Sequence, residues 1–446
     1  MAVKKLTEGD PQKLILAFTI PLILGNVFQQ LYAFVDTFMV GRFLGVKALA
    51  AVGSTGALMF LVWGFIGGFT TGLSICAGQR FGARDRSGVR KSAATSVWIC
   101  VALTLVVSIV GYVTCRDLLI FMETPAEILE GAYDFISVVY VGSFAFIFLQ
   151  LQTNLMRALG DSKTPTYILA ISLTLNIIFE PIAIIVLDGG IFGAALAIVV
   201  AQTIGNLLAA FYIHKKISVL HTRYVDWKID WKVMWEHLKL ALPMGFQLSI
   251  IAVGAVILQI ALNNLGPIAI AAYAAAQKVE SVAAMPMMSF GIAMAAYTAQ
   301  NYGAKKFDRI HDGIVACVKM SVSFAIIVGI TLIFFGHYLI ELFVGEGFQA
   351  AEVVESGKIY LLTNGASLWL LSLMFIFRNV LQGLGKAMAP TVTGVIELFM
   401  RAAAAILLIP LFGFTGACLA NPLAWIGAVI PLLIAYHYVK RKLRML

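Results

Sequence analysis

The lengths of the charge-free stretches constrain this chain more than any other feature. Runs without Asp, Glu, Lys or Arg cover 14–35, 48–79, 92–115, 135–156, 189–213, 240–277, 281–304, 359–377 and 402–439. A helix needs ~20 apolar residues to cross ~30 Å of hydrocarbon. Every one of these runs is about that long or longer, so each can hold at least one membrane span.

Twelve spans account for the whole pattern. The two longest runs are broken internally, by Asn-Asn-Leu-Gly-Pro at 263–267 and by Gly-Phe-Thr-Gly at 413–416. Further apolar segments lie at 163–187, 315–340 and 389–411. Inside hydrocarbon only helices and closed barrels satisfy every backbone group, and these runs lack the alternating period of barrel strands. The sequence therefore predicts an all-α integral membrane protein with twelve transmembrane helices.

Composition supports this class and excludes others. Apolar residues make up 61% of the 446 residues and charged residues 12%, whereas soluble chains are about half apolar and a quarter charged. A cytosolic enzyme, a disordered protein and a disulfide scaffold are therefore excluded. The six His residues lack metal-ligand spacing, and the chain has no GxxxxGK[ST] loop for ATP. We therefore expect neither enzyme activity nor a cofactor.

The distribution of basic residues predicts the orientation. Most of the 32 Lys and Arg residues fall in every second connector, while the alternate connectors are mainly acidic. By the positive-inside rule, we expect a multi-pass protein of the cytoplasmic (inner) cell membrane with both termini in the cytoplasm. The formal net charge of +9 then reflects topology in the lipid bilayer, so no nucleic-acid partner is expected.

The chain repeats itself at an offset of 221 residues. The matching blocks are 44–51 with 265–272 and 78–84 with 299–305, and then, at slightly different offsets, 159–165 with 384–390 and 193–197 with 416–420. Each half holds six spans, an even number, so both halves begin on the same side of the membrane. The sequence therefore predicts two parallel six-helix repeats around a central cavity, an arrangement in which substrate binds between the repeats.

These repeats define the predicted domains. An N-lobe covers 1–213, a C-lobe covers 240–446, and a cytoplasmic linker covers 214–239 between them. Three tryptophans recur in the linker at every fourth position: Trp227, Trp231 and Trp235. This spacing indicates an amphipathic helix that lies in the membrane interface.

Charged residues within the predicted spans mark sites of function or of ion pairing, because an intramembrane charge is costly. In the second half, Glu397 and Arg401 lie four residues apart and can neutralise each other on one helix face. Lys278 and Glu280 lie two residues apart, so they point to different faces and need other partners. We interpret these four residues as gating or structural ion pairs.

The first half differs, because Asp36 and Glu180 have no cation nearby in their own spans. Asn176 lies four residues before Glu180 on the same helix face, and Gln29 shares a face with Asp36. The second half lacks both acids, and its Arg401 corresponds to Asn176. Hard monovalent cations bind clusters of oxygen atoms, and paired carboxylates raise each other's proton affinity. We therefore predict an Na⁺ or H⁺ site in the N-terminal half alone; a structural, hydrogen-bonded role for the two acids is the alternative.

Four sets of residues, taken in order, resemble the multidrug and toxic compound extrusion (MATE) family. They are Asp36-Thr37 with Val40-Gly41, Gln79 with Gly82-Ala83, Asn154 with Arg157 and Gly160-Asp161, and the pair Asn176 and Glu180. The resemblance covers the whole chain and is strongest to prokaryotic members whose cation site lies in the N-lobe. It implies that the coupling cation binds at Asp36, Asn154, Asn176, Glu180 and Thr203, with Na⁺ at Asp36, Asn176 and Glu180. It also implies that Pro21 lets the first helix bend, whereas Glu180 departs from the Asp often found at its position.

The same resemblance implies a secondary antiporter that functions as a monomer. It would export amphipathic, cationic organic compounds (multidrug efflux) by alternating access, driven by an inward Na⁺ or H⁺ gradient. Candidate residues of the substrate cavity are Gln29, Met285, Met288 and Met374. Flexible thioethers suit a promiscuous apolar cavity, although ordinary helix packing explains each methionine equally well.

Two alternatives remain open at this point. A lipid-linked oligosaccharide flippase of the same superfamily resembles this chain in repeat and topology, but such proteins usually have more spans and a strongly basic central cavity. This chain has only three bases within its spans: Lys278, Arg378 and Arg401. A membrane-embedded enzyme or receptor is the second alternative, and it leaves the internal repeat unexplained.

Overall fold

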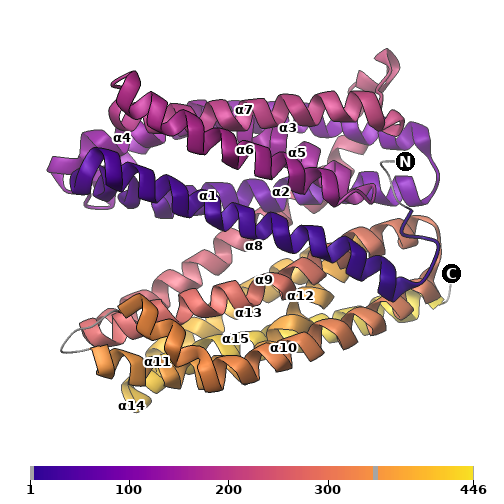
Figure 1. The fold of residues 1–446 in the computed structure, drawn as a ribbon. Coiled ribbons are helices and arrows are strands. Elements are labelled where there is room, and N and C mark those ends of the chain that lie inside the picture. The colour runs from indigo at the N-terminus through magenta and orange to yellow at the C-terminus, as the bar shows by residue number, and fades with distance from the viewer. Residues whose placement is uncertain (1–4, 345–349, 445–446) are drawn as a thin grey trace. The chain divides into compact units, whose positions relative to one another are not determined.

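The computed structural model describes residues 5–344 and 350–444, and all regular structure in them is helical (Figure 1). The first half contains α1 (Pro11–Ser54), α2 (Gly56–Gly82), α3 (Arg86–Phe121), α4 (Ala126–Val141), α5 (Ser143–Ala158), α6 (Lys163–Pro181), the π-helical turn η1 (Ile182–Val186) and α7 (Gly190–Lys216). The outermost residues of both termini, whose side of the membrane the sequence predicts, lie outside the described residues.

Short 3₁₀ turns η2 (Ser218–Leu220) and η3 (Tyr224–Trp227) connect the first half to the second. The second half contains α8 (Trp231–Asn263), α9 (Pro267–Gly303), α10 (Phe307–Val344), α11 (Ala350–Gly365), α12 (Leu368–Gly383), α13 (Met388–Ala403), the π-helical turn η4 (Ala404–Leu408), α14 (Ile409–Phe412) and α15 (Phe414–Arg444).

The number of spans agrees with the sequence. Among the described residues, ten helices are long and apolar enough to cross a membrane, and the count reaches 12 if each of two bent pairs forms one span. Those pairs are α4–α5, bent by 48°, and α11–α12, bent by 47°. The predicted all-α, twelve-span class is confirmed.

Backbone conformations repeat between the halves at the predicted offset. The chain turns at Gly45 in the first half and at Gly266 in the second, with φ of 82° and 91°, values that glycine adopts at little cost. Other pairs with positive φ are Arg84 and Lys305, Gly160 and Gly385, and Gly190 and Gly413. The two π-helical turns, η1 and η4, also occupy corresponding places. The internal repeat is therefore a property of the fold as well as of the sequence.

The described chain forms two compact units whose boundaries fall inside helices. Among the described residues, one unit contains Lys5 and 20–245, and the other contains 6–19, 246–344 and 350–444. Helices α1 and α8 therefore each pass from one unit to the other, beside Pro21 and Pro243 respectively. The predicted division at 213 and 240 did not anticipate this, because it counted whole spans.

The segment before α1 is bound to the start of α10 and the end of α9. The Leu6 N–H donates to the Gln300 side chain over 2.9 Å, and Asn301 donates back to the Leu6 carbonyl over 3.2 Å. Lys306 donates to the Thr7 carbonyl over 2.8 Å. Gln300 and Asn301 belong to the repeated block 299–305, so one role of that block is to hold the chain that leads into α1.

The linker differs from the predicted amphipathic helix. Trp227 ends the turn η3, and α8 begins only at Trp231, so Trp227 lies outside the helix that carries Trp231 and Trp235. Asp230 is the reason for this start, because its side chain accepts the Lys232 backbone N–H over 3.0 Å. Acceptance of a first-turn N–H by an Asp side chain is a strong helix-start signal.

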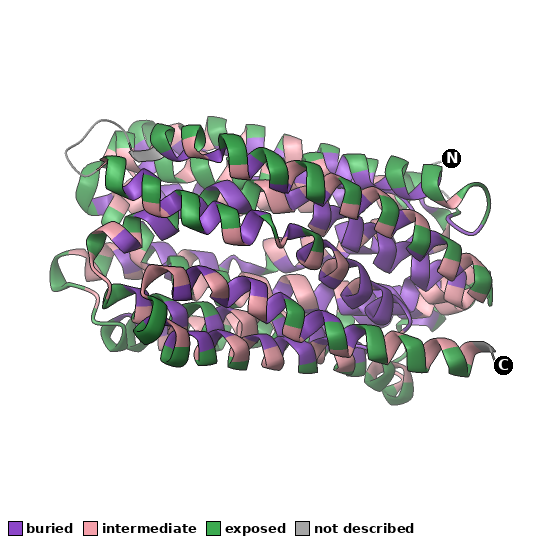
Figure 2. Ribbon diagram, turned by 90° about the horizontal axis from the view of Figure 1, so that it is seen from below, coloured by how far each residue is buried: buried purple, intermediate pink, exposed green. Residues whose placement is uncertain are grey.

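Many large apolar side chains of both units are exposed; Figure 2 shows exposed residues in green. Phe34 and Val113 of one unit are each 68% exposed, and Phe334 of the other is 65% exposed. Apolar side chains on the outside fit a protein whose surrounding solvent is hydrocarbon. Inside one unit, α8 crosses α2 closely: a Cβ added at Gly68 would lie 2.2 Å from the Met244 carbonyl oxygen.

Candidate cation site in the first half

A cavity of about 280 Å³ lies between helices α1, α2, α4, α5, α6 and α7 of the first unit. Its walls are mainly apolar and include Phe28, Trp63 and Phe146, with the last two rings 4.2 Å apart between centroids. Polar side chains also line it: Gln29, Tyr32, Asp36, Gln150, Ser172 and Gln202. No Lys or Arg belongs to the described lining, so Asp36 faces a cavity without a basic counter-charge.

Helical spacing on α1 and α6 positions the polar groups. Gln29, Tyr32 and Asp36 lie at positions i, i+3 and i+7 of α1, which is one face of a helix. On α6, Asn176 and Glu180 lie one turn apart, one turn beyond Ser172. Pro181 follows Glu180 directly and lacks a backbone N–H, and the π-helical turn η1 begins at the next residue. Such π-helical turns occur often at functional sites.

Both α6 residues are fully buried, at 0% exposure for Asn176 and for Glu180. The Asn176 Nδ2 donates to Glu180 Oε2 over 3.0 Å. The Asp36 and Glu180 carboxyls are near enough to influence each other electrostatically, but of these three residues only Asp36 belongs to the cavity lining. The binding of a cation by Asp36, Asn176 and Glu180 together remains a prediction.

Several buried oxygen atoms in this region have no hydrogen-bond partner among the described residues. They are Asp36 Oδ1, Glu180 Oε1, Asn176 Oδ1, Tyr32 OH, Ser172 Oγ and Gln202 Oε1. Buried polar atoms are normally satisfied, so a group of unsatisfied ones needs an explanation. Oxygen donors suit hard cations such as Na⁺, and a carboxylate pair also suits a proton. Within the described ranges no group of three His, Cys, Asp or Glu could hold a metal ion.

Two predicted ligands are engaged elsewhere. Asn154 donates to the hydroxyls of Thr70 and Thr71 on α2, over 3.0 and 3.3 Å, and accepts from Arg157 over 3.4 Å. The Thr203 hydroxyl donates to the Val199 carbonyl over 2.7 Å. Neither residue lines the cavity, so a direct role for Asn154 and Thr203 in cation binding remains a prediction.

The corresponding region of the second unit is filled by paired charges. Arg378 of α12 and Arg401 of α13 both pair with the buried Glu397, the second at 3.7 Å. The Tyr360 hydroxyl donates to Glu280, which is buried, whereas Lys278 is exposed. The predicted pairing of Glu397 with Arg401 is seen. Glu280 is bonded to a tyrosine instead of a base and Lys278 is exposed, so the ion-pair role of these two residues, and any gating role of the four, remain predictions.

Arg401 lies beside Gly254 of α8. A Cβ added at Gly254 would lie 3.5 Å from the Arg401 Cδ, which is an ordinary contact distance. Asn176 takes the place of Arg401 in the first half. The second unit thus carries a guanidinium where the first unit carries an amide, and the first unit holds a mainly apolar cavity with an acid and other polar side chains in its lining.

The predicted methionines of the substrate cavity lie within the packing of the second unit. Met285 and Met374 are buried and Met288 is half-buried. Gln29 is the one predicted cavity residue that lines the cavity of the first unit. The structure leaves the substrate role of the three methionines as a prediction.

Both repeats match a known family profile. The profile described as MatE covers residues 21–182 and 243–407. This chain is a member of the MATE family. It is 30% identical over 339 residues to the probable multidrug resistance protein YoeA of Bacillus subtilis (strain 168), a match covering 74% of this chain and 73% of YoeA. The multidrug export protein MepA of Staphylococcus aureus (strain NCTC 8325 / PS 47) is 23% identical over 91% of this chain and 88% of MepA.

Solved MATE structures share the fold. A crystal structure of MATE in complex with MaL6 aligns with a TM-score of 0.91 at 21% identity, covering 99% of both chains. An outward-facing MATE family transporter of the MOP superfamily aligns with a TM-score of 0.91 at 21% identity, covering 100% of this chain and 99% of that one. At this identity the likeness establishes the MATE fold. What this chain binds must be inferred from its own residues.

Sequence reasoning missed two polar residues of this MATE cavity, namely Tyr32 and Ser172. Their spacing could have found both, because Tyr32 lies one turn from Asp36 and Ser172 one turn from Asn176. Sequence reasoning also did not pair Arg378 with Glu397. That pair joins α12 to α13, and spacing along one helix carries no signal for it.

Proposed function

We propose that this MATE-family protein exports amphipathic, cationic organic compounds by antiport against an inward flow of Na⁺ or H⁺. One observation carries the proposal: Asp36 and Glu180 share a buried, oxygen-rich region whose described cavity lining holds no base. Two carboxylates close together in a low dielectric bind a cation or a proton strongly, because neutralisation removes their repulsion and their desolvation cost. The names of YoeA and MepA, which concern multidrug resistance and export, agree with this direction of transport.

Coupling would act through α1, which carries Asp36. Pro21 lies on the same helix and lacks the N–H that would bond to the Ala17 carbonyl, so the helix is weakened there. The Thr166 hydroxyl donates to the Pro21 carbonyl over 2.7 Å and ties this point of α1 to α6. Cation binding between Asp36 of α1 and Glu180 of α6 would therefore change the bend at Pro21 and lower the affinity for substrate.

The walls of the cavity favour organic cations as substrates. Phe28, Trp63 and Phe146 line the same cavity as Asp36, and the faces of aromatic rings attract cations. A charged organic compound and the coupling ion would then compete for one carboxylate. Substrate contacts of Met285, Met288 and Met374 are part of the same proposal.

Proteoliposomes test this function. The purified chain would be reconstituted, loaded with a fluorescent cationic dye, and given an Na⁺ gradient and a pH gradient in separate experiments. We expect at least one gradient to drive dye movement, and Asp36→Asn and Glu180→Gln each to lower that rate about tenfold or more, equivalent to ~1.4 kcal/mol or more of lost coupling.

Glu355→Gln is the matched control, because Glu355 is an exposed acid paired with Lys358 at 3.0 Å. It removes one carboxylate far from the cavity residues in sequence and should leave transport unchanged. Full gradient-driven export by Asp36→Asn would show that the coupling role is wrong.

The flippase alternative receives less support. Arg378 and Arg401 both pair with Glu397, so these three groups leave one net positive charge, which is far from the strongly basic cavity expected of a flippase for an anionic oligosaccharide. The proposal also includes two further points, namely that both termini lie in the cytoplasm and that the protein functions as a monomer. Labelling of single-cysteine variants in intact cells would test the side of the membrane on which the termini lie. Crosslinking in the membrane would test the oligomeric state.

A further inference from the structure

We propose that the outer surface of the linker binds the headgroups of anionic phospholipids. This linker surface consists of Arg223, Tyr224, Val225, Lys228, Ile229, Trp231, Lys232, Trp235 and Lys239. The proposal is independent of the transport cycle, because none of these residues belongs to the Asp36 cavity.

The linker is fixed to α2 and α3 by its acidic residues. Each of its three acids pairs with a base on those helices: Asp226 with Arg90 at 3.0 Å, Asp230 with Lys91 at 2.5 Å, and Glu236 with Arg80 at 3.3 Å. The Trp98 indole adds a bond to the Trp227 carbonyl over 3.1 Å, and the buried His237 bonds to Ser92 over 2.6 Å. The segment is therefore a rigid part of the first unit.

This anchoring separates the charges of the linker. Its acids face the helices, while the side chains of Arg223, Lys228, Lys232 and Lys239 are exposed. The outer side consequently carries positive charge that the linker's own acids do not neutralise. A partner of complementary charge must be anionic, and lysine ammonium groups bind phosphate well as point charges.

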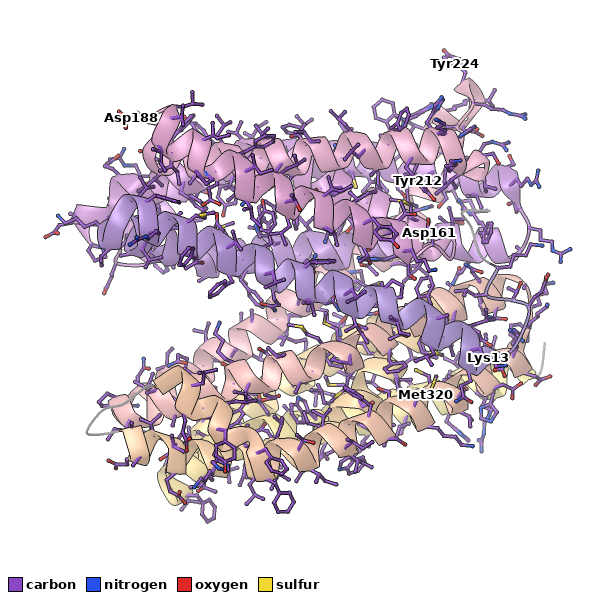
Figure 3. All side chains as sticks on the ribbon, in the orientation of Figure 1. Lys13, Asp161, Asp188, Tyr212, Tyr224 and Met320 are labelled. Atoms are coloured by element: carbon purple, nitrogen blue, oxygen red, sulfur yellow. The ribbon has the colours of Figure 1, made fainter. Side chains whose placement is uncertain are left out.

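Exposed aromatic rings lie among these bases. Tyr224 is 95% exposed, Trp231 is 76% exposed and Trp235 is 56% exposed. Figure 3 shows Tyr224 projecting away from the helices, at the opposite end of the first unit from Asp188. The Lys239 ammonium lies 5.6 Å from the centroid of the Trp235 ring, so charge and aromatic surface are contiguous.

The position of the rings selects a lipid over a soluble anion. Trp231 and Trp235 lie in the first turns of α8, a helix with the length and hydropathy of a membrane span. Tryptophan at the end of a span sits at headgroup depth, and basic residues there attract anionic lipids. At this depth the basic side chains can contact the phosphodiester of a lipid headgroup, and the aromatic rings can contact the acyl chains directly below it.

Tryptophan quenching tests the proposal in the full chain. The protein would be placed in nanodiscs of phosphatidylcholine containing an equal fraction of either brominated phosphatidylglycerol or brominated phosphatidylcholine. The quenching of Trp231 and Trp235 is obtained as the difference in quenched fluorescence between the unmodified protein and Trp231→Phe/Trp235→Phe. We expect quenching by brominated phosphatidylglycerol to exceed that by brominated phosphatidylcholine about twofold or more, and the excess to vanish near 1 M salt, where the screening length is ~3 Å.

A charge variant separates lipid recognition from simple immersion. In Lys228→Gln/Lys232→Gln/Lys239→Gln, brominated phosphatidylglycerol and brominated phosphatidylcholine should quench equally. Trp231 and Trp235 should still be quenched by both lipids. The matched control, Lys305→Gln/Lys386→Gln/Lys442→Gln, removes the same charge from exposed lysines of the second unit and should keep the preference. Equal quenching by both lipids in the unmodified protein would overturn the proposal and identify a neutral interfacial anchor. Absence of quenching by either lipid would overturn it in favour of a water-exposed surface or a protein partner.

Discussion

Asn176 and Glu180 lie one turn apart on α6, and the amide of the first donates to the carboxylate of the second over 3.0 Å. The bond uses one oxygen of Glu180 and the amide nitrogen of Asn176. It leaves Glu180 Oε1 and Asn176 Oδ1, both buried, without a partner among the described residues. The pair thus has two buried oxygen atoms that are not satisfied within the described protein, and oxygen atoms are the ligands that hard cations prefer.

Removal of the amide should weaken cation binding without unfolding the protein. In Asn176→Ala, Glu180 loses a charge-assisted hydrogen bond worth ~1.5–3 kcal/mol, and the site loses one oxygen ligand. If Na⁺ is the coupling ion, we expect the half-saturating Na⁺ concentration for dye export to rise about 10- to 150-fold. Thr174→Ala, an exposed position of the same helix, is the control, and an unchanged Na⁺ dependence in Asn176→Ala would contradict the assignment.

The paired charges of the second unit should contribute to stability as a group. Replacing Arg401 by Met removes one of the two partners of the buried Glu397, which keeps Arg378, so the cost should be below the ~3–5 kcal/mol of a buried charge left with no partner. Glu397→Gln/Arg401→Met should therefore be more stable than the sum of its single variants predicts. Thermal unfolding in detergent measures this double-mutant cycle. Strict additivity of the single variants would show that the pair is not energetically coupled.

The sequence predicts this fold well, because its strongest signals are local. Run lengths and broken runs give twelve helices, and the offset that aligns Gly45 with Gly266 predicts the shared turn that the backbone shows. The Glu397–Arg401 pair is equally local, since helical spacing alone brings the two side chains together.

What the sequence did not predict depends on packing between helices. Arg378 contacts Glu397 from a different helix, and Asn154 is engaged by threonines of α2. The division of α1 and α8 between the two units likewise follows from packing. The spacing of three tryptophans predicts one linker helix that includes Trp227. The Asp230 side chain instead caps the start of α8, so the helix begins after Trp227 and contains only the other two tryptophans.

The close crossing of α2 and α8 should tolerate no side chain at Gly68. A Cβ there would lie 2.2 Å from the Met244 carbonyl oxygen, which is backbone and has little room to move. Gly68→Ala should therefore destabilise the protein by ~1–3 kcal/mol through overpacking. Gly53→Ala is the control, because no atom lies within 4 Å of its added Cβ. A melting temperature of Gly68→Ala equal to that of Gly53→Ala would contradict this account.

The attachment of the linker to α3 should persist until the solution is strongly acidic. The hydrogen bond from Lys91 is the main cause that lowers the pKa of Asp230 below its usual 3.8, helped by the Val233 backbone N–H. A carboxylate whose pKa is lowered by folding stabilises the folded state fully above its unfolded pKa, and loses that contribution as the pH falls through the folded value. Loss of the Asp230 contribution should therefore speed hydrogen exchange over 223–233, corrected for the intrinsic rate, only below about pH 4. Burial lowers the pKa of His237, which also joins the linker to α3, from 6.5 to about 4, so its protonation in the detached state adds a separate rise between those two values. Asp230→Asn should show faster exchange above about pH 4 and lose the step below it, unlike Asp188→Asn at the other end of the unit. The same acid step in Asp230→Asn would mean that another group causes it.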